Sequence, residues 1–437
     1  MFETLKNVFR VKEMRRKLLY LIWMIFIIRI GCQIPVPGVD SDFFKQWFSS
    51  NAGDAFNFFD AFTGGSFERM SIFALNITPY ITSSIIIQLL TIAIPALEEM
   101  QRDGEEGRKK IQEYTRYLTV GLALMQSAAM AIGFGGQGLL LDFTALNVIV
   151  TVATMTAGSA VLMWIGERIT ENGVGNGISI VLLFNILSTI PSDMISLYER
   201  FMQGRPVGAA ALSLVIIVAV IAAIVVFVII LQDAQRVIPV QYSKKMQGRK
   251  LVGGQQSKIP LKVNTAGVIP IIFASSIMQF PIMLQNVLKY ENNGFIGKAL
   301  TSLNSSTWFD ASHPKRSIGL LIYIVLVVLF AYFYTSITFN PVQIADNLKK
   351  AGGVVPGITP GRSTSEYLNK ILNYIVFIGA VGLMIVALIP IMCTGFFNAS
   401  VSFGGTSIII IVGVVLETMK QIESMMVNRN YRGFLSE

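Results

Sequence analysis

Charged residues are scarce in this chain, and histidine and cysteine are nearly absent. Only 14% of the 437 residues are charged, against about 25% in a typical soluble domain, and 53% are hydrophobic. The two cysteines, Cys32 and Cys393, fall in or beside apolar segments, which indicates free thiols and no disulfide framework. The single histidine, His313, lies in a polar loop, and one histidine cannot build a histidine-based zinc or haem site. We therefore expect a polytopic membrane protein with no metal and no cofactor.

Long apolar runs predict ten membrane-spanning helices, because a helix needs about 20 apolar residues to cross a bilayer. The uncharged stretch 371–416 would form a helix about 69 Å long, so the turn-rich residues 393–405 should divide it into two spans. A basic, amphipathic segment, residues 1–17, should lie on the membrane surface. The expected spans cover residues 18–34, 75–97, 117–141, 143–166, 175–190, 212–231, 263–288 and 317–339, followed by the two within 371–416.

The stretch 55–97 has an unusual make-up for a loop followed by a span. Its second part is uncharged and long enough to cross, whereas residues 55–74 are only half apolar and contain two glycines, a glutamate and an arginine. Non-helical backbone at membrane depth survives only where protein or a water-filled cavity surrounds it. We interpret the first part as a re-entrant segment inside a cavity; an ordinary extracytoplasmic loop is the alternative.

The distribution of positive charge predicts the orientation. With a cytoplasmic N-terminus, 26 of the 35 Lys and Arg residues lie on the cytoplasmic side, eight lie on the other side, and Arg29 lies within the first span. Cytoplasmic loops of membrane proteins typically carry an excess of Lys and Arg, so this asymmetry indicates a cytoplasmic N-terminus. Ten spans then place the C-terminus in the cytoplasm too. The loops 233–262 and 340–370 are longer and more basic than orientation requires, so ribosomal RNA or an acidic protein could bind there.

Motifs for several kinds of chemistry are missing. No GxxxxGK[ST] loop for nucleotide phosphates is present, and GGQQSK at Gly253 lacks the second glycine. Paired aspartates, a serine–histidine pair and an HExxH helix, which intramembrane proteolysis would need, are not apparent. Spans 2 to 10 contain essentially no ionisable residue for ion coupling. We therefore expect no catalytic residue and no enzyme activity, but a passive conduit driven from outside; a substrate-specific secondary transporter is the alternative.

Several longer stretches, in order along nearly the whole chain, resemble the SecY family of protein-conducting channels in its bacterial form. They are RIGCQIPVPG at Arg29, FTGGSFERMSIFALNITPYITSSIIIQLL at Phe62, EGRKKIQEYTRY at Glu106, ITENGVGNGISI at Ile169, PLKVNTAGVIPIIFASS at Pro260, FNPVQIADNLKKAGGVVPGITPG at Phe339 and FGGTSIII at Phe403. The resemblance implies an all-α membrane protein with two pseudo-symmetric inverted five-helix halves around a central pore. It implies an N-terminal half at 18–192, a hinge loop at 193–211, a C-terminal half at 212–418 and a cytoplasmic tail at 419–437.

The resemblance also implies roles for particular residues. A plug would cover residues 62–74, with Phe62, Gly64, Gly65, Phe67, Glu68, Arg69, Ser71 and Ile72. A pore ring, which closes by dewetting and deformable apolar contact, would consist of Ile77, Ile81, Ile178, Leu182, Ile272 and Ile410. A lateral gate would involve Gln88, Thr115, Thr119, Ser275, Ser276 and Gln279. Taken singly, these residues would otherwise be ordinary core, lipid-facing or helix-packing side chains.

The two long cytoplasmic loops resemble the family's docking site for the SecA motor ATPase and the ribosome. The candidates are Lys244, Lys245, Arg249, Lys250, Lys349, Lys350, Thr359 and Arg362. Thr359 stands where many relatives have an arginine important to motor coupling, and Arg362, three residues on, is the candidate to supply that charge. The implied partners are SecE, SecG, SecA, the ribosome, signal peptides, nascent secretory or membrane polypeptides and anionic lipid, with no small-molecule substrate. The implied location is the bacterial plasma membrane.

Overall fold

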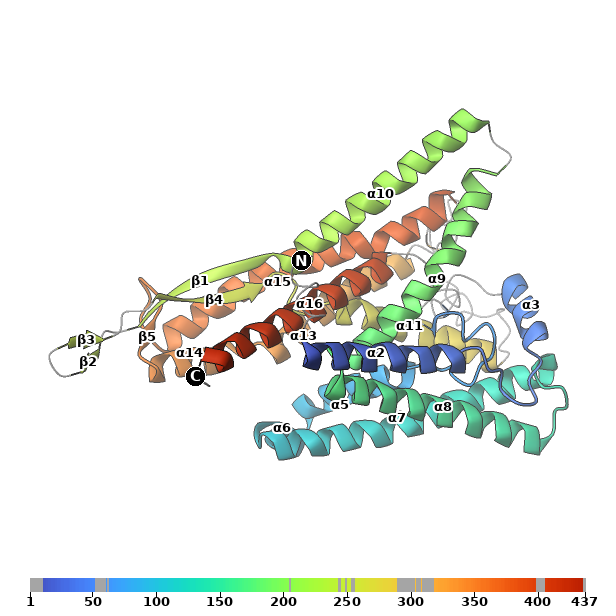
Figure 1. Ribbon diagram of the computed structural model, residues 1–437, viewed down its shortest axis with the longest axis horizontal. Helices are drawn as coiled ribbons and strands as arrows, with labels where there is room; N and C mark the ends of the chain where they lie inside the picture. Colours follow the sequence, from blue (N-terminus) through green and yellow to red (C-terminus); the bar gives the residue numbers. More distant parts are fainter. Residues whose placement is uncertain are drawn as a thin grey trace. The chain divides into compact units, whose positions relative to one another are not determined.

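The computed structural model describes residues 11–51, 60, 63–203, 206–242, 245–247, 250–252, 256–288, 303, 308, 318–397 and 405–434. The chain divides into two compact units. Unit 1 comprises Met1–Ser196, Ile282–Lys298 and Val414–Glu437, and unit 2 comprises Leu197–Pro281 and Ala299–Gly413. Figure 1 shows that helices make up most of each unit.

Unit 1 is built from helices of the N-terminal half of the chain. In order these are α2 (Lys12–Gly31), α3 (Ser41–Asn51), α5 (Thr78–Ala93), α6 (Pro95–Arg102), α7 (Glu105–Phe134), a π-helical turn (Gly135–Leu139), α8 (Ala145–Asn172) and most of α9 (Gly177–Phe201). The part of α16 (Gly405–Phe434) from Val414 onward also belongs to it. Helices α7 and α8 lie side by side, and α5 packs against α7 (Figure 1).

A proline ends α5 earlier than the expected span 75–97. Pro95 has no N–H to donate to the carbonyl of Thr91, and its ring disfavours a helical conformation in the residue before it. Ile94 is accordingly extended, with φ −114° and ψ 110°. The chain then starts α6 at an angle of 108° to α5, so this pair is sharply bent and not one straight helix.

Unit 2 combines helices with two small sheets, one of three strands (β4, β1 and β5) and one of two (β2 and β3). Its elements are α10 (Val207–Asp233), β1 (Gln235–Tyr242), β2 (Lys245–Gln247), β3 (Lys250–Val252), β4 (Gln256–Lys262), the first part of α11 (Ile269–Leu288), α13 (Ile318–Thr338), α14 (Pro341–Lys350), β5 (Gly353–Val354) and α15 (Arg362–Phe397). Asn340 caps α14, because its side-chain oxygen accepts hydrogen bonds from the N–H groups of Val342 and Gln343 at 3.1 and 3.2 Å.

The three-stranded sheet joins the two long loops that the sequence presents as separate polar segments. Its strand order is β4-β1-β5, with β1 antiparallel to both neighbours. Gln241 pairs with Val354 and Tyr242 with Gly353, so the loop after α10 is hydrogen-bonded to the loop after α13. Ile238 and Val240 alternate along β1 and are buried at 2% and 0% exposure in an apolar cluster with side chains of α14 and α15.

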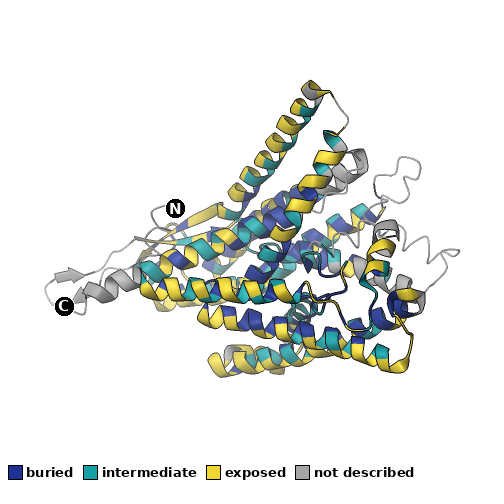
Figure 2. Ribbon diagram, turned by 45° about the vertical axis from the view of Figure 1, so that its right-hand side comes forward, coloured by how far each residue is buried: buried dark blue, intermediate teal, exposed yellow. Residues whose placement is uncertain are grey.

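Six helices in the described part of the chain are long and apolar enough to cross a membrane, or up to seven if the bent pair α5–α6 counts as one. They are α7, α8, α9, α10, α13 and α15. Figure 2 shows α10 exposed along most of its length, although it is apolar on every side. A helix that is hydrophobic all round is buried in protein or lipid, so α10 is suited to contact lipid.

Helices α9 and α15 both continue past an expected end. Helix α9 continues through Pro191 to Phe201, whereas the span was expected to end at residue 190. Helix α15 continues past Cys393 to Phe397, beyond the point where the expected turn begins. Residues 398–404, which contain most of that turn, lie outside the described chain.

Candidate functional site: a buried re-entrant segment and its surroundings

Residues 63–76, which include most of the predicted plug 62–74 and are called the re-entrant segment below, consist mainly of turns in the structure. That they enter the membrane stays a prediction. Gly64 and Gly65 have φ values of +68° and +79°, and Met70 and Asn76 have φ values of +47° and +51°. This left-handed conformation is costly for a residue with a Cβ, more so for methionine than for asparagine. Met70 is 0% and Asn76 1% exposed, so surrounding packing holds both in place. The segment is therefore packed into unit 1.

The chain just after α2 pairs with this segment in a short strand-like contact. The N–H of Ile72 donates to the carbonyl of Ile34 at 2.9 Å, and the N–H of Val36 donates to the carbonyl of Met70 at 3.0 Å. These two backbone hydrogen bonds bracket an isolated bridge between Pro35 and Ser71. They fix the C-terminal arm of the segment to the chain that follows α2.

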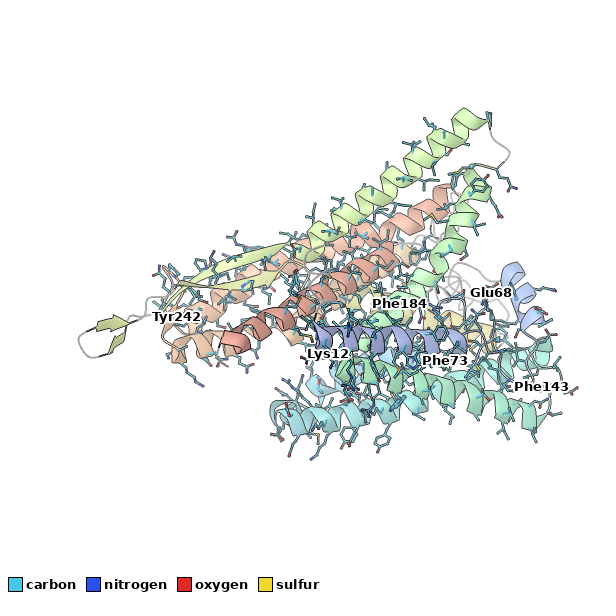
Figure 3. All side chains as sticks on the ribbon, viewed as in Figure 1. Lys12, Glu68, Phe73, Phe143, Phe184 and Tyr242 are labelled. Carbon is cyan, nitrogen blue, oxygen red and sulfur yellow. The ribbon has the colours of Figure 1, made fainter. Side chains whose placement is uncertain are left out.

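Two glycines make room for the same arm. A Cβ added to Gly31 of α2 would lie 2.1 Å from the ring of Phe73, which Figure 3 shows beside α2. A Cβ added to Gly158 of α8 would lie 2.1 Å from the carbonyl oxygen of Ile72. Because normal Cβ contacts are longer than 3.0 Å, a Cβ at Gly31 would displace the Phe73 ring, and a Cβ at Gly158 would displace the backbone of Ile72.

An apolar cluster lies under the segment. The ring of Phe67 meets that of Phe44 edge-on at 5.7 Å, and Phe44 meets Phe134 of α7 in the same way at 5.7 Å. Met70 and Met155 of α8 belong to the same buried cluster. Such aromatic pairs add roughly 0.5–1.5 kcal/mol beyond area burial. The segment therefore packs onto α3, α7 and α8 as a core element does.

The N-terminal end of the segment is held by polar contacts with Asp60. The N–H of Glu68 donates to the Asp60 carboxylate at 3.0 Å, and the hydroxyl of Thr63 donates to the Asp60 carbonyl at 3.0 Å. Thr63 in turn accepts from the N–H of Phe67 at 3.3 Å. Burial raises the pKa of Asp60 to about 6, although the hydrogen bond from Glu68 works in the opposite direction.

The predicted plug residues lie mostly in this segment. Phe62 falls outside the described residues. Arg69 is exposed, and its guanidinium contacts the side-chain oxygen of Gln33. The remaining predicted members, which the structure places within the segment, are Gly64, Gly65, Phe67, Glu68, Ser71 and Ile72.

The six predicted ring residues are divided between the two units, four in unit 1 and two in unit 2. Those in unit 1 are Ile77, Ile81, Ile178 and Leu182, and those in unit 2 are Ile272 and Ile410. Ile77 precedes α5 and is fully buried, whereas Ile81 is half-buried one turn later. Ile178 is half-buried and packs beside Gly166 of α8, where an added Cβ would lie 3.0 Å from its Cγ1. That these residues form a common ring stays a prediction.

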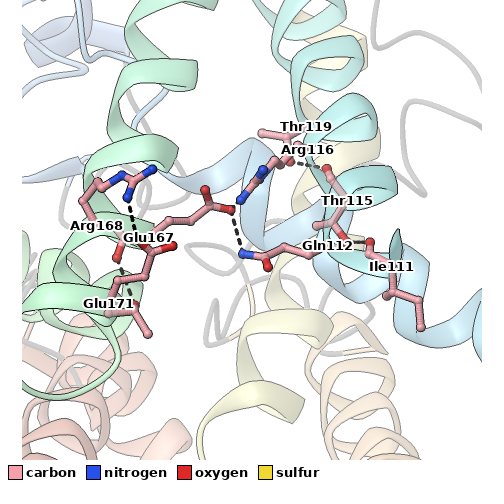
Figure 4. Close-up of polar contacts among 10 residues, drawn as sticks. Ile111, Gln112, Thr115, Arg116, Thr119, Glu167, Arg168 and Glu171 are labelled. Atoms are coloured by element: carbon pink, nitrogen blue, oxygen red, sulfur yellow. Dashed lines mark hydrogen bonds and ion pairs between the residues drawn. The ribbon is translucent and has the colours of Figure 1, made fainter. Parts of the chain in front are cut away.

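The six predicted gate residues are likewise divided, with Gln88, Thr115 and Thr119 in unit 1 and Ser275, Ser276 and Gln279 in unit 2. The hydroxyls of Thr115 and Thr119 donate to carbonyls four residues earlier in α7, at 2.9 and 2.7 Å (Figure 4). Ser275 is hydrogen-bonded to the side chain of Tyr323 on α13. The side chains of Ser276 and Gln279 lie outside the described part. Their role at a gate stays a prediction.

Sequence reasoning missed an ion pair between α7 and α8 whose carboxylate is buried. The carboxylate of Glu167 accepts from Arg116 Nε at 2.9 Å and from Gln112 Nε2 at 3.0 Å (Figure 4). The Glu167 side chain is only 9% exposed. A charge removed from water needs such partners, so the pair fixes α7 to α8 near the end of an otherwise uncharged span. The only signal in the sequence is an acidic residue directly after the apolar run.

The predicted docking residues that the structure describes lie in unit 2, most of them on strands and helices. Lys244 and Arg249 lie outside the described residues, and Lys245 and Lys250 are in β2 and β3. Lys349 and Lys350 are exposed in the last turn of α14, where positive charge is favoured by the helix dipole.

Arg362 and Thr359 are both exposed in the second loop. Arg362 Nε lies 2.9 Å from a carboxylate oxygen of Glu366, and the Arg362 side chain is 93% exposed. An exposed pair of this kind contributes little, so Arg362 can exchange Glu366 for another anion at small cost. In the part of the chain that the structure describes, no three His, Cys, Asp or Glu side chains gather as metal ligands.

Comparison with known proteins gives the family. The SecY family model matches residues 71–419. The protein translocase subunit SecY of Streptomyces galbus is 42% identical over 450 residues, and that of Aquifex aeolicus is 39% identical over 442 residues; each alignment covers 100% of both chains.

Solved structures share the fold at low identity. A protein-conducting channel is 18% identical, with a TM-score of 0.66 over 94% of this chain and 93% of the other. Sec61 from a canine ribosome–channel complex is also 18% identical, with a TM-score of 0.63 over 94% and 93% of the two chains. The full-length relatives and the family match together show that this chain belongs to the SecY family.

Proposed function

We propose that this chain is the central pore-forming subunit of a bacterial Sec translocase, which passes unfolded secretory polypeptides across the plasma membrane. Support comes from full-length relatives that are protein translocase subunits. The observation that carries the mechanism is the re-entrant segment, which is buried in unit 1 and held to α2 and α8. In this proposal residues 62–74 are the plug that closes the resting pore.

The pore ring is the second part of the proposal. Its six aliphatic residues would close around any threaded sequence, because apolar contacts deform and require no particular hydrogen-bond partner. They would also keep ions out by dewetting when no polypeptide is present. The chain would cross the membrane ten times in two inverted halves, with both termini in the cytoplasm. Of these spans, six or seven are supported by helix length and composition in the described residues.

The chain itself would not hydrolyse nucleotide; SecA or the ribosome would supply the force. The sheet of β4, β1 and β5, with the exposed lysines of α14 and with Arg362, is the candidate docking surface. A related channel, Sec61, was solved in a ribosome complex. We further propose that SecE and SecG assemble with the chain, that anionic lipid contacts its basic face, and that apolar segments leave sideways through the gate residues.

The test is ion leak through the resting protein in reconstituted vesicles. Ile81→Ser and Ile272→Ser place hydroxyls in the proposed ring and should raise the resting conductance, because a polar constriction wets more readily. The control is Ile216→Ser on α10, where the isoleucine is 53% exposed. Unchanged conductance in both ring variants would refute the ring.

Deletion of residues 62–74 separates the remaining functions. A plugged channel should leak more after the deletion. A scaffold or insertase without a pore would show the same conductance with and without the segment. A secondary transporter would instead show saturable, ion-coupled uptake of a small solute.

A further inference from the structure

Arg29 is a positive charge within the first span, and its contacts join three separate parts of unit 1. Its Nη2 donates to the carbonyl of Phe184 at 2.5 Å and to the side-chain oxygen of Asn185 at 3.2 Å, both on α9. Its Nη1 donates to the carbonyl of Gly64 in the re-entrant segment at 3.5 Å. An arginine at membrane depth is expensive unless it is paired or bonded to carbonyls. Arg29 therefore has a structural reason to hold these oxygens.

A second donor approaches the same carbonyl from α9. The hydroxyl of Ser188 lies 3.4 Å from the carbonyl oxygen of Gly64 and 2.7 Å from that of Asn185. The Gly64 carbonyl thus lies between a guanidinium from α2 and a hydroxyl from α9. The contact is made through the backbone of the segment and does not depend on its side chains.

The glycine at position 64 gives independent support. Its φ of +68° is unfavourable for other residues, and an added Cβ would lie 2.9 Å from Ser188 Oγ, 3.0 Å from the Asn185 carbonyl and 3.1 Å from Arg29 Nη1. Arg29, Asn185 and Ser188 therefore surround the α-carbon of Gly64 as well as its carbonyl group. The backbone of the segment is therefore fitted into a cradle formed by Arg29, Asn185 and Ser188.

The contacts of Arg29 and Ser188 with α9 are shorter than their contacts with Gly64, so the re-entrant segment can separate from them while the contacts with α9 remain. Arg29 is bound to α9 at 2.5 and 3.2 Å, and Ser188 is bound within α9 at 2.7 Å. Both contacts with the Gly64 carbonyl are long, at 3.5 and 3.4 Å, and hydrogen bonds weaken at such distances. The single hydroxyl proton of Ser188 is shared between the carbonyls of Gly64 and Asn185, with the shorter contact to Asn185. If the segment moves away, Arg29 and Ser188 keep their α9 partners and no buried charge is left alone.

We propose that Arg29, Asn185 and Ser188 form a latch that holds the Gly64 carbonyl and keeps the plug closed in the resting channel. The latch is weak toward the plug and strong toward α9, so a translocating polypeptide can displace the plug without disrupting the helices. This inference rests on the proposed channel function and adds the residues that set its resting state.

The experiment measures resting ion leak and polypeptide transport in vesicles that contain the protein with its co-purifying partners. Ser188→Ala removes one donor to Gly64, and Arg29→Lys keeps the charge but loses the guanidinium fork. Each should raise resting leak several-fold, up to about tenfold, while polypeptide transport is retained. A general loss of structure would lower yield and transport together, so the two readouts distinguish a latch from a folding defect.

Thr189→Val is the matched control. Its hydroxyl, like that of Ser188, donates to the carbonyl three residues earlier in α9, at 2.9 Å, and has no bond to Gly64 among the contacts of the described chain. Equal leak in Ser188→Ala and Thr189→Val, or wild-type leak in Arg29→Lys, would overturn the latch. If Ile81→Ser and Ile272→Ser leak while the latch variants stay tight, the channel function stands and only the latch fails. If none of these variants and no plug deletion leaks, the proposed function fails.

Discussion

The close approach of the re-entrant segment to α8 predicts a large effect of adding one methyl group at Gly158. A Cβ there would lie 2.1 Å from the carbonyl oxygen of Ile72 and 2.9 Å from its carbonyl carbon. Ile72 cannot easily yield, because its N–H is bonded to the carbonyl of Ile34 at 2.9 Å. Gly158→Ala must therefore push the C-terminal arm of the proposed plug away from α8 by about 1 Å to restore a normal contact.

The cost follows from known overpacking effects. Extra methyl groups in a tightly packed site typically cost about 1–3 kcal/mol, and this favours the displaced plug by about 5- to 150-fold. The matched control is Gly121→Ala in α7, where an added Cβ has no neighbour within 4 Å. Alanine is favoured over glycine in a helix by about 1 kcal/mol, so this control should be neutral or stabilising.

The assay pairs resting ion leak in vesicles with thermal unfolding in detergent. Gly158→Ala should leak more than the wild type, and Gly121→Ala should not. A Gly158→Ala protein with the leak and melting temperature of the wild type would show that the arm is not confined as described, and would refute the reasoning.

Two other predictions concern charged groups. Arg116→Met leaves the Glu167 carboxylate buried with Gln112 as its remaining partner, and should lower the free energy of unfolding by roughly 2–4 kcal/mol, less than for a fully enclosed pair because Arg116 is 41% exposed. Arg168→Met, in the exposed pair with Glu171, should cost at most about 1 kcal/mol, and equal melting temperatures for the two variants would contradict this assignment. Because burial raises the pKa of Asp60 from 3.8 to about 6, its contribution to the closed plug is present below about pH 4 and is lost as the pH rises through 6. Resting leak should therefore be lower at pH 5 than at pH 7.5, and Asp60→Asn should remove this difference; an unchanged pH profile in that variant would exclude Asp60 as its source.

The positions of the helices follow from apolar runs, but their ends depend on context. Pro95 gives a local signal, because α5 ends at Ala93, two residues before this proline. Pro191 carries the same signal, yet α9 continues through it to Phe201. Loss of one backbone hydrogen bond can be outweighed by packing of the flanking turns, and a single sequence does not reveal that balance.

Contacts between residues far apart in the sequence could not be predicted from local sequence patterns. Arg116 and Glu167 are 51 residues apart, and the partners Gln241 and Val354 are still farther apart. The half-apolar composition of residues 55–74 predicted a re-entrant segment, and most of residues 63–74 are buried in the structure, whereas their entry into the membrane stays a prediction. The left-handed backbone at Met70 was not predictable, because methionine has no preference for that conformation and packing alone imposes it.

The pairing of β1 with β5 has a mechanical consequence. Strand β1 follows α10 after a single residue, and β5 lies between α14 and α15. Because the strands are hydrogen-bonded, a load applied to the tip of the β1–β4 hairpin is shared between α10 and α15, and neither loop can swing without dragging the other. A partner that binds either loop therefore applies force to both helices, α10 and α15.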